Sequence, residues 1–210
     1  FSKKASTSAS STADLLEGPK VEWLETRGGN SHFYEVVGAP TGINWTDAQA
    51  WASSHGGYLA TIVTTAEDKF VFNLLGDARF QDASVYHSFW IGGIQPPGSH
   101  EPGGDWKWVN NEGAVSDNEW GPGQPDNLDD NENRMAMFGP NVKEPPGSWD
   151  DRAMTDLVHG FVVEFDPPVS HASMQVASHQ GIYIAGFVVA MVLLLFFNCR
   201  KPLPPQRTPE

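Results

Sequence analysis

Three short segments decide how this chain folds: WGPGQPDN at residues 120–127, NEN at 131–133 and WDD at 149–151. They gather carboxyl and amide side chains in a region rich in glycine and proline. Calcium in proteins takes about six to eight oxygen ligands at roughly 2.3 to 2.6 Å, which a loop supplies by collecting carboxylates and amides on one patch. Gln124 and Asp126, on either side of Pro125, are the first candidates for such ligands.

Two short helices are predicted before this region. Thr46 is a candidate N-cap for a helix that runs through His55 and ends at the following Gly-Gly pair, and Asn44, which precedes this helix, is an alternative cap. Thr64 followed three residues later by Glu67 has the pattern of a capping box, and it precedes the apolar stretch FVFNLLG at 70–76.

The pattern changes after residue 76 to short apolar or alternating segments between long Gly, Pro, Asp and Asn stretches. These segments are SFWIGGI at 88–94, WKWV at 106–109, MAMFG at 135–139 and GFVVEF at 160–165. Such segments are typical of short antiparallel strands around irregular loops. The predicted class is α+β, with two short helices, small antiparallel sheets and a long loop region.

The order of these motifs resembles the C-type lectin-like fold across some 135 residues. The resemblance is carried by Trp45, Ala48, GYLATI (57–62), Glu67, WIGG (90–93), WKWV (106–109), WGPGQPDN, NEN, WDD and GFVVEF. It implies a C-type lectin-like domain at residues 30–166. We interpret the tryptophans at 90, 106 and 108 as core residues.

The resemblance also implies a calcium site and a sugar site. By this resemblance, the family's calcium-ligand positions are occupied here by Gln124, Asp126, Glu132, Asp150 and Asp151. In the family, the peptide bond before the proline that corresponds to Pro125 is cis. Two vicinal sugar hydroxyls then complete the coordination of the ion, sharing contacts with all of these ligands except Asp151. The Gln-Pro-Asp order is associated with galactose-type sugars. Two alternatives stay open: the acids are simply solvated, or the domain binds a protein surface, since many members of this fold bind no sugar.

The family's usual disulfide positions are occupied here by Ala52 with Val163 and by Arg134 with Met154. The chain has a single cysteine, Cys199, so it cannot form an intramolecular disulfide. Apolar packing can replace the first pair. Arg134 is expected to need a carboxylate partner.

Composition and charge narrow the possible functions. The 210 residues suit one domain with appendages, and the net charge of −13 disfavours nucleic acid as a partner. The single cysteine rules out zinc sites built on paired cysteines. The seven histidines are scattered, without a local serine or acid in a catalytic pattern. We therefore expect a protein that is not an enzyme.

The termini differ from the domain in composition. We predict a Ser/Thr-rich N-terminal tail and linker at 1–29, a linker at 167–180, one transmembrane helix at 181–198 and a Pro-rich basic tail at 199–210. The segment 181–197 is uncharged, and a helix of that length spans roughly 25 Å. The basic residues that follow it predict a C-terminus on the cytosol-like side and a domain on the extracytosolic or lumenal side.

Two functional readings follow. The first is a membrane-anchored binding module in which calcium organises a loop that recognises a carbohydrate or a protein surface. The second is a non-catalytic accessory subunit of a large membrane complex, such as an organellar photosynthetic or respiratory complex. The basic, hydroxyl-rich, acid-poor start resembles the remnant of a transit peptide, so an organelle membrane such as the thylakoid is included.

Overall fold

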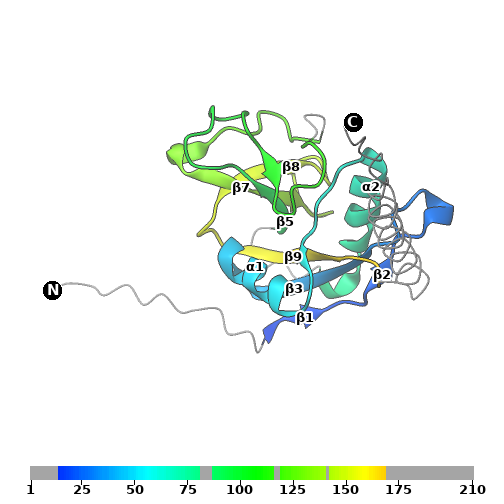
Figure 1. Ribbon diagram of the computed structural model, residues 1–210. Coiled ribbons are helices and arrows are strands. Elements are labelled where there is room, and N and C mark those ends of the chain that lie inside the picture. Colours follow the sequence, from blue (N-terminus) through cyan, green and yellow to red (C-terminus); the bar gives the residue numbers. More distant parts are fainter. Residues whose placement is uncertain (1–13, 81–86, 116–118, 141, 169–210) are drawn as a thin grey trace, which may run out of the picture. The chain divides into compact units, whose positions relative to one another are not determined.

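The computed structural model describes residues 14–80, 87–115, 119–140 and 142–168 (Figure 1). The described strands are β1 (Leu16–Glu17), β2 (Val21–Glu22), β3 (Phe33–Ile43), β4 (Tyr58–Leu59), β5 (Ser88–Ile94), β6 (Lys107–Trp108), β7 (Glu132–Phe138), β8 (Trp149–Ala153) and β9 (Val158–Phe165). The described helices are α1 (Trp45–Ser54) and α2 (Thr65–Leu74), with short 3-10 turns at η2 (Glu25–Arg27), η3 (Ala78–Phe80) and η4 (Leu128–Asp130).

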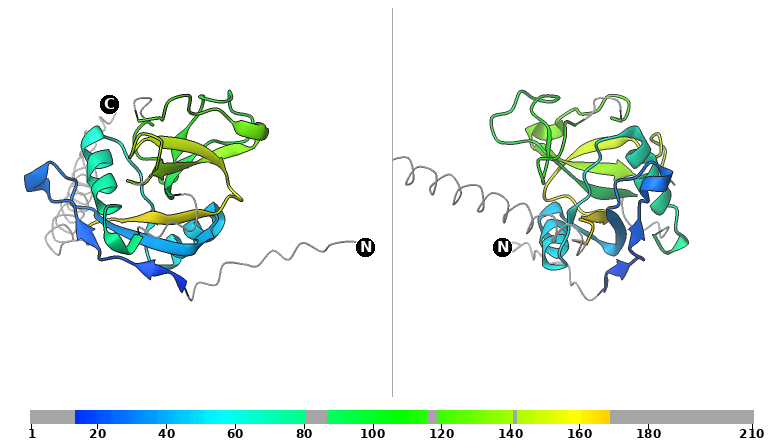
Figure 2. Two further views of the ribbon diagram at one scale, coloured as in Figure 1. Left: turned by 180° about the vertical axis from the view of Figure 1, so that it is seen from behind. Right: turned by 45° about the vertical axis from the view of Figure 1, so that its right-hand side comes forward.

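The strands form one mixed sheet in the order β1-β3-β9-β5-β7-β8, to which β2, β4 and β6 add at the sides. The predicted α+β class and C-type lectin-like fold are confirmed in outline, but the expected set of small, purely antiparallel sheets is wrong. The difference arises because β5 lies parallel to β9, which joins the two halves into one sheet. Figures 1 and 2 show the segments between β5 and β7, coloured green, gathered beside β7 and β8.

The central pair β3 and β9 brings the two ends of the domain together. Their register runs from Phe33 opposite Phe165 to Gly38 opposite Gly160. A side chain at position 160 would place its Cβ 2.4 Å from the Val37 carbonyl oxygen, so the close approach of the strands requires glycine there. The long strand β3 was not predicted from the sequence.

Helix α1 begins two residues earlier than a cap at Thr46 predicts. Its N-cap is Asn44, whose side-chain oxygen accepts a hydrogen bond from the Asp47 backbone N–H, and Thr46 lies inside the first turn. Of the two candidate caps, Thr46 is therefore wrong and Asn44 is confirmed. Gly56, at φ +81°, follows the helix end in the left-handed conformation that a side chain disfavours.

Helix α2 has the predicted cap at Thr64, whose hydroxyl accepts from the Glu67 N–H at 3.1 Å. The second hydrogen bond of a capping box, from the N-cap backbone N–H to the Glu carboxylate, is replaced by another contact. The Glu67 carboxylate accepts from the Val63 N–H at 2.8 Å, and it also accepts from the Tyr34 hydroxyl. Glu67 thereby joins the helix start to β3.

Tryptophans fill the core on both sides of the sheet. Trp90, Trp108 and Trp149 are fully buried, and the Trp108 and Trp149 rings meet edge to face at 5.6 Å. Trp106 is only partly buried and packs edge-on against Trp120. The buried Trp149 ring anchors the start of β8, which carries the next two acidic residues of the site.

The N-terminal strands β1 and β2 both pair with β3, although they lie in the range read from the sequence as tail and linker. Trp23 shares in this packing, because it is buried and its ring stacks on Phe70 with centroids 5.6 Å apart. Residues from 16 onward thus contribute to the sheet and its core.

Side-chain packing takes the place of both family disulfides. Ala52 and Val163 are fully buried in the same core cluster. The Arg134 guanidinium lies 4.6 Å from the centre of the Trp45 ring, and its Nη2 lies 4.0 Å from the Met154 sulfur. The expectation of a carboxylate partner for Arg134 is wrong, because an aromatic face can hold a guanidinium.

In the described part of the chain, no helix combines the length and apolarity needed to cross a bilayer. The predicted span at 181–198 and its flanking linker and tail lie outside the described residues, apart from the first two linker residues.

Candidate functional site

The loop between Trp120 and β7 folds back onto β8. The Gln124–Pro125 peptide bond is cis, as the resemblance implies. The backbone N–H groups of Asp126 and Asn127 donate to the two carboxylate oxygens of Asp151, at 2.9 and 2.8 Å. Asn127 adopts a left-handed conformation at φ 48°, which turns the chain into η4. One buried carboxylate therefore shapes the loop.

Three acids converge at this point. The carboxylate oxygens of Asp126, Glu132 and Asp151 lie within 4.8 Å of one another. Glu132 is held by two hydrogen bonds, because its carboxylate accepts from the Leu128 N–H at 2.9 Å and its own N–H donates to the Asn127 side chain at 3.0 Å. The loop and the two strands thus present three negative groups to one small volume.

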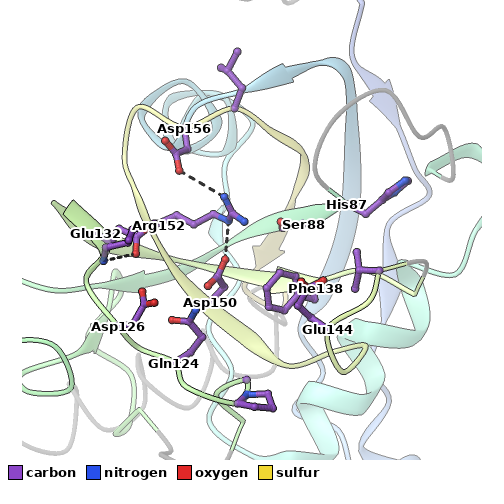
Figure 3. A pocket seen from close by; sticks show the side chains of 15 residues that line it. His87, Ser88, Gln124, Asp126, Glu132, Phe138, Glu144, Asp150, Arg152 and Asp156 are labelled. Atoms are coloured by element: carbon purple, nitrogen blue, oxygen red, sulfur yellow. Dashed lines mark hydrogen bonds and ion pairs between the residues drawn. The ribbon is translucent and has the colours of Figure 1, made fainter. Parts of the chain in front are cut away.

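The remaining predicted residues, Gln124 and Asp150, line a pocket together with Asp126 and Glu132 (Figure 3). The Gln124 Oε1 atom is buried and has no hydrogen-bond partner among the described residues. Asp150 is differently placed, since its Oδ2 lies 2.9 Å from the Arg152 Nε.

Arg152 was missed by sequence reasoning. Its guanidinium also approaches the Asp156 carboxylate, with Nη1 to Oδ2 at 3.6 Å. The signal was its spacing, because residues two apart in a strand share a face, so an arginine at this position reaches Asp150. Arg152 thereby offsets part of the negative charge of the site.

Burial raises the pKa of Glu132, Asp150 and Asp151. The pKa of Glu132 is raised to about 7, mainly by burial and in smaller part by the charges of Asp151 and Asp150, while the hydrogen bond from the Leu128 N–H opposes the shift. Burial also raises the pKa of Asp150 to about 6 despite the opposing charge of Arg152. For Asp151, burial raises the pKa while the two backbone N–H donors from the loop oppose it. Clustered carboxylates in a partly dry site favour the binding of a cation.

The donor set fits calcium. Oxygen is the ligand atom of every residue that converges here, and calcium prefers carboxylate and amide oxygens. The Gln124 Oε1 atom, buried without a partner in the described chain, is the further ligand that such an ion would satisfy. Asp126, Glu132 and Asp151 would hold the ion together with Gln124, while Asp150 contributes next to Arg152.

The pocket beside this cluster has a volume of about 540 Å³. Its walls come from the loop, from β7 and β8, and from the start of β5. The lining residues are His87, Ser88, Gly121, Pro122, Gln124, Asp126, Leu128, Glu132, Phe138, Val142, Glu144, Asp150, Arg152, Asp156 and Leu157. Asp151 is not among the lining residues, although its carboxylate lies within 4.8 Å of those of Asp126 and Glu132.

The chain is similar to several known proteins. It is 34% identical over 100 residues to the perlucin-like protein of Mytilus galloprovincialis, which covers 47% of this chain and 55% of that protein. It is 27% identical over 136 residues to the human C-type mannose receptor 2, covering 61% of this chain and 8% of the receptor. The chain thus spans about half of the first relative and a small part of the second.

Solved structures share the fold. The C-type lectin CEL-I from Cucumaria echinata superposes with a TM-score of 0.52 at 20% identity, over 66% of this chain and 93% of that one. A calcium-dependent type II antifreeze protein, in its calcium-free form, superposes with a TM-score of 0.51 at 23% identity, over 65% and 94%. The family model described as Lectin C-type domain matches residues 41–162, which is more than half of the chain. The chain therefore belongs to the C-type lectin domain family.

Proposed function

We propose that this domain binds carbohydrate in a calcium-dependent manner and performs no catalysis. The observation that carries this proposal is the convergence of Asp126, Glu132 and Asp151 within 4.8 Å at the edge of a pocket. The amide oxygen of Gln124 also supports the proposal, because it is buried in the pocket wall and has no hydrogen-bond partner among the described residues. Family membership adds the carbohydrate class of ligand, which the names of its relatives also suggest.

The residues of the site have different roles in binding. Bound calcium supplies positive charge and coordination positions for two neighbouring sugar hydroxyls. Glu132, Asp150 and Gln124 line the pocket and accept or donate hydrogen bonds at those hydroxyls. Asp151 orders the loop by accepting hydrogen bonds from the N–H groups of residues 126 and 127. No covalent bond changes.

A galactose-type ligand is the more specific proposal. It rests on the Gln124-Pro125-Asp126 order, in which an amide and a carboxylate flank the proline. The acid at Asp150, where the family uses an amide, is partly neutralised by Arg152 and so adds less charge than its side chain suggests. Competition between galactose and mannose decides this point.

The test uses the full chain, with calcium followed by calorimetric titration and sugar binding measured in calcium and in chelator. We expect one calcium per chain and binding of galactose only in calcium. Asp126→Asn should weaken both. Asp129→Asn, which removes the same charge from an exposed position in the same loop, serves as the matched control and should change neither. Sugar binding that persists in chelator contradicts the proposal.

We also propose that the uncharged segment 181–197 tethers the domain to a membrane on its extracytosolic or lumenal side. The support is compositional: seventeen uncharged residues precede Arg200 and Lys201. Protease added to sealed vesicles from the domain side should spare a C-terminal epitope. Digestion of that epitope contradicts the topology. If calcium and sugar do not bind and the protein co-purifies with a membrane complex, the accessory-subunit reading is favoured instead.

A further inference from the structure

The guanidinium of Arg134 in β7 has a donor that its neighbours leave unused. Its carbon lies 4.6 Å from the centre of the Trp45 ring, and its Nη1 donates to the backbone and side-chain oxygens of Asn133, at 2.6 and 2.9 Å. The Nε–H is buried and has no hydrogen-bond partner among the described residues. Buried polar groups nearly always have a partner, so the Nε side of Arg134 lacks an acceptor that it needs.

The group beside these donors is a sulfur. The Nη2 of Arg134 lies 4.0 Å from the Sδ of Met154, the residue that follows β8. In a guanidinium, the Nε–H and one hydrogen of Nη2 point to the same side and form a fork that fits oxygen acceptors. A thioether sulfur is only a weak acceptor. The contact therefore joins strong donors to a weak acceptor.

The side chain of Met154 is accessible to small oxidants. Its exposed fraction is 43%, whereas Met135 and Met137 in β7 are fully buried. Peroxide converts a methionine thioether to a sulfoxide. An S–O bond forms while the O–O bond breaks, the sulfur loses two electrons, and the second oxygen leaves as water with both protons. Of these three methionines, peroxide reaches Met154 most readily.

A sulfoxide at residue 154 supplies the acceptor that Arg134 lacks. Its oxygen stands one bond beyond the sulfur, and the flexible methionine side chain can bring it to the usual donor distance of about 2.7 to 3.2 Å. A hydrogen bond from a charged donor is stronger than one between neutral groups. The backbone carbonyl of Met154 also accepts from the Trp45 N–H at 3.2 Å. The sulfoxide would therefore tighten a contact that joins the start of α1, β7 and the end of β8.

We propose that Met154 is a site of oxidation by peroxide and that Arg134 holds the resulting sulfoxide, so that oxidation stabilises the domain. The two residues occupy positions where the family usually has a disulfide. Oxidation thus gives this pair a stronger connection in which one sulfur and a guanidinium take the place of two cysteines. The proposal does not depend on calcium or sugar binding.

The test treats the full chain with hydrogen peroxide and maps the oxidised residues by peptide mass spectrometry. Met154 should be oxidised at least about tenfold faster than Met135 and Met137, because the sulfurs of those two are shielded. Urea unfolding in chelator should then show an equilibrium constant for unfolding about fivefold lower than in the untreated chain, the usual effect of one hydrogen bond. Methionine sulfoxide reductases for both epimers should reverse the change.

Three variants assign the effect to this pair. Met154→Leu reports oxidation at the other methionines, which include Met174 and Met191, and peroxide should leave its stability unchanged. Arg134→Leu removes the donors and should abolish the gain at an oxidised Met154. Met154→Gln carries an amide oxygen in place of the sulfoxide oxygen, so without peroxide it should be more stable than Met154→Leu.

Three results would overturn the proposal. The first is oxidation of Met154 that is no faster than oxidation of the two buried methionines. The second is an oxidised chain that is no more stable than the untreated one, and the third is a gain that persists in Arg134→Leu. Should Arg134→Leu fail to fold, the comparison of Met154→Gln with Met154→Leu decides, and equal stability of those two variants refutes the role of Arg134.

Discussion

Two acidic clusters in this domain have similar compositions but differ in the groups that donate hydrogen bonds to their carboxylates. The loop cluster consists of Asp126, Glu132 and Asp151, and the buried cluster consists of His32, Glu67, Glu112 and Glu164. Candidate ligand atoms lie within 4.8 Å of one another in the loop cluster, and also among the histidine and two of the glutamates of the buried one. Composition alone therefore does not distinguish them.

In the buried cluster, side chains and backbone of the chain supply the hydrogen bonds. One carboxylate oxygen of Glu164 accepts from both the backbone N–H and the hydroxyl of Thr61, each at 2.8 Å. Its other oxygen lies 2.6 Å from the His32 Nδ1. Glu67 accepts from the Tyr34 hydroxyl, as described for α2. This network joins β3, β9 and the start of α2, so we interpret it as structural.

The loop cluster is held differently. Its acids receive backbone N–H groups from the loop itself, and the neighbouring cation, Arg152, contacts Asp150 instead. The negative charge of Asp126, Glu132 and Asp151 therefore has no neighbouring cation from Arg152 to offset it directly, and it lies beside the pocket. The hydrogen-bond donors around the carboxylates, more than the number of acids, therefore separate a structural cluster from a cation site.

The largest expected effect comes from breaking the buried cluster. Glu164→Ala should lower the free energy of unfolding by about 3 to 5 kcal/mol, because it leaves buried donors without an acceptor. Asp126→Ala should change it by less than about 0.5 kcal/mol in chelator, since that side chain is exposed. Urea unfolding in chelator measures both. Equal losses from the two variants would show that the clusters do not differ.

Calcium should stabilise the chain through the loop cluster only. At 100 times its dissociation constant, a ligand that binds the folded state adds about 2.7 kcal/mol. Melting in calcium and in chelator should show this gain in the unmodified chain and in Glu112→Gln, and its loss in Asp126→Asn. The reverse pattern would place the ion in the buried cluster.

Asp68 follows Glu67 in α2, and its carboxyl accepts a hydrogen bond from the Trp149 ring N–H at 2.9 Å. Burial raises its pKa from 3.8 to about 7. The folded chain therefore holds this proton more tightly than the unfolded chain does. The resulting contribution to the free energy of unfolding is fully present below pH 3.8 and is lost as the pH rises through about 7.

Asp68→Asn keeps the acceptor for the indole and removes the titration. The variant should gain about 1 kcal/mol or more over the unmodified chain at pH 8 and flatten the decline in stability between pH 4 and 7. Urea unfolding in chelator across this pH range is the measurement. An unchanged pH profile would show that Asp68 does not titrate in this range.

The smallest effect concerns the contact that replaces the second family disulfide. Arg134→Gln should cost about 0.5 to 1 kcal/mol, the usual contribution of a cation held over an aromatic face. Calcium affinity should change little, because Arg134 does not line the pocket. A large loss of calcium affinity would mean that this contact positions Glu132, two residues away. Lys143→Gln, at an exposed position, is the control.

Much of the fold was predictable from local pattern. The capping signal at Thr64 and the alternating segments near β5, β7 and β9 predicted elements whose residues are neighbours in sequence. The Asn44 cap was harder to choose, because Asn44 and Thr46 are both good caps and only the backbone decides between them. The strand β3 was missed because Gly38, Pro40 and Gly42 interrupt its apolar pattern.

The sequence by itself determined the family, the acidic loop around Pro125 and the absence of an intramolecular disulfide. Only the tertiary structure decided which acids already have donors, since Glu164 bonds Thr61 at a separation of 103 residues. It also decided that Arg134 lies over Trp45. The physical reason is that hydrogen bonding and burial depend on neighbours in space, which local pattern does not reveal.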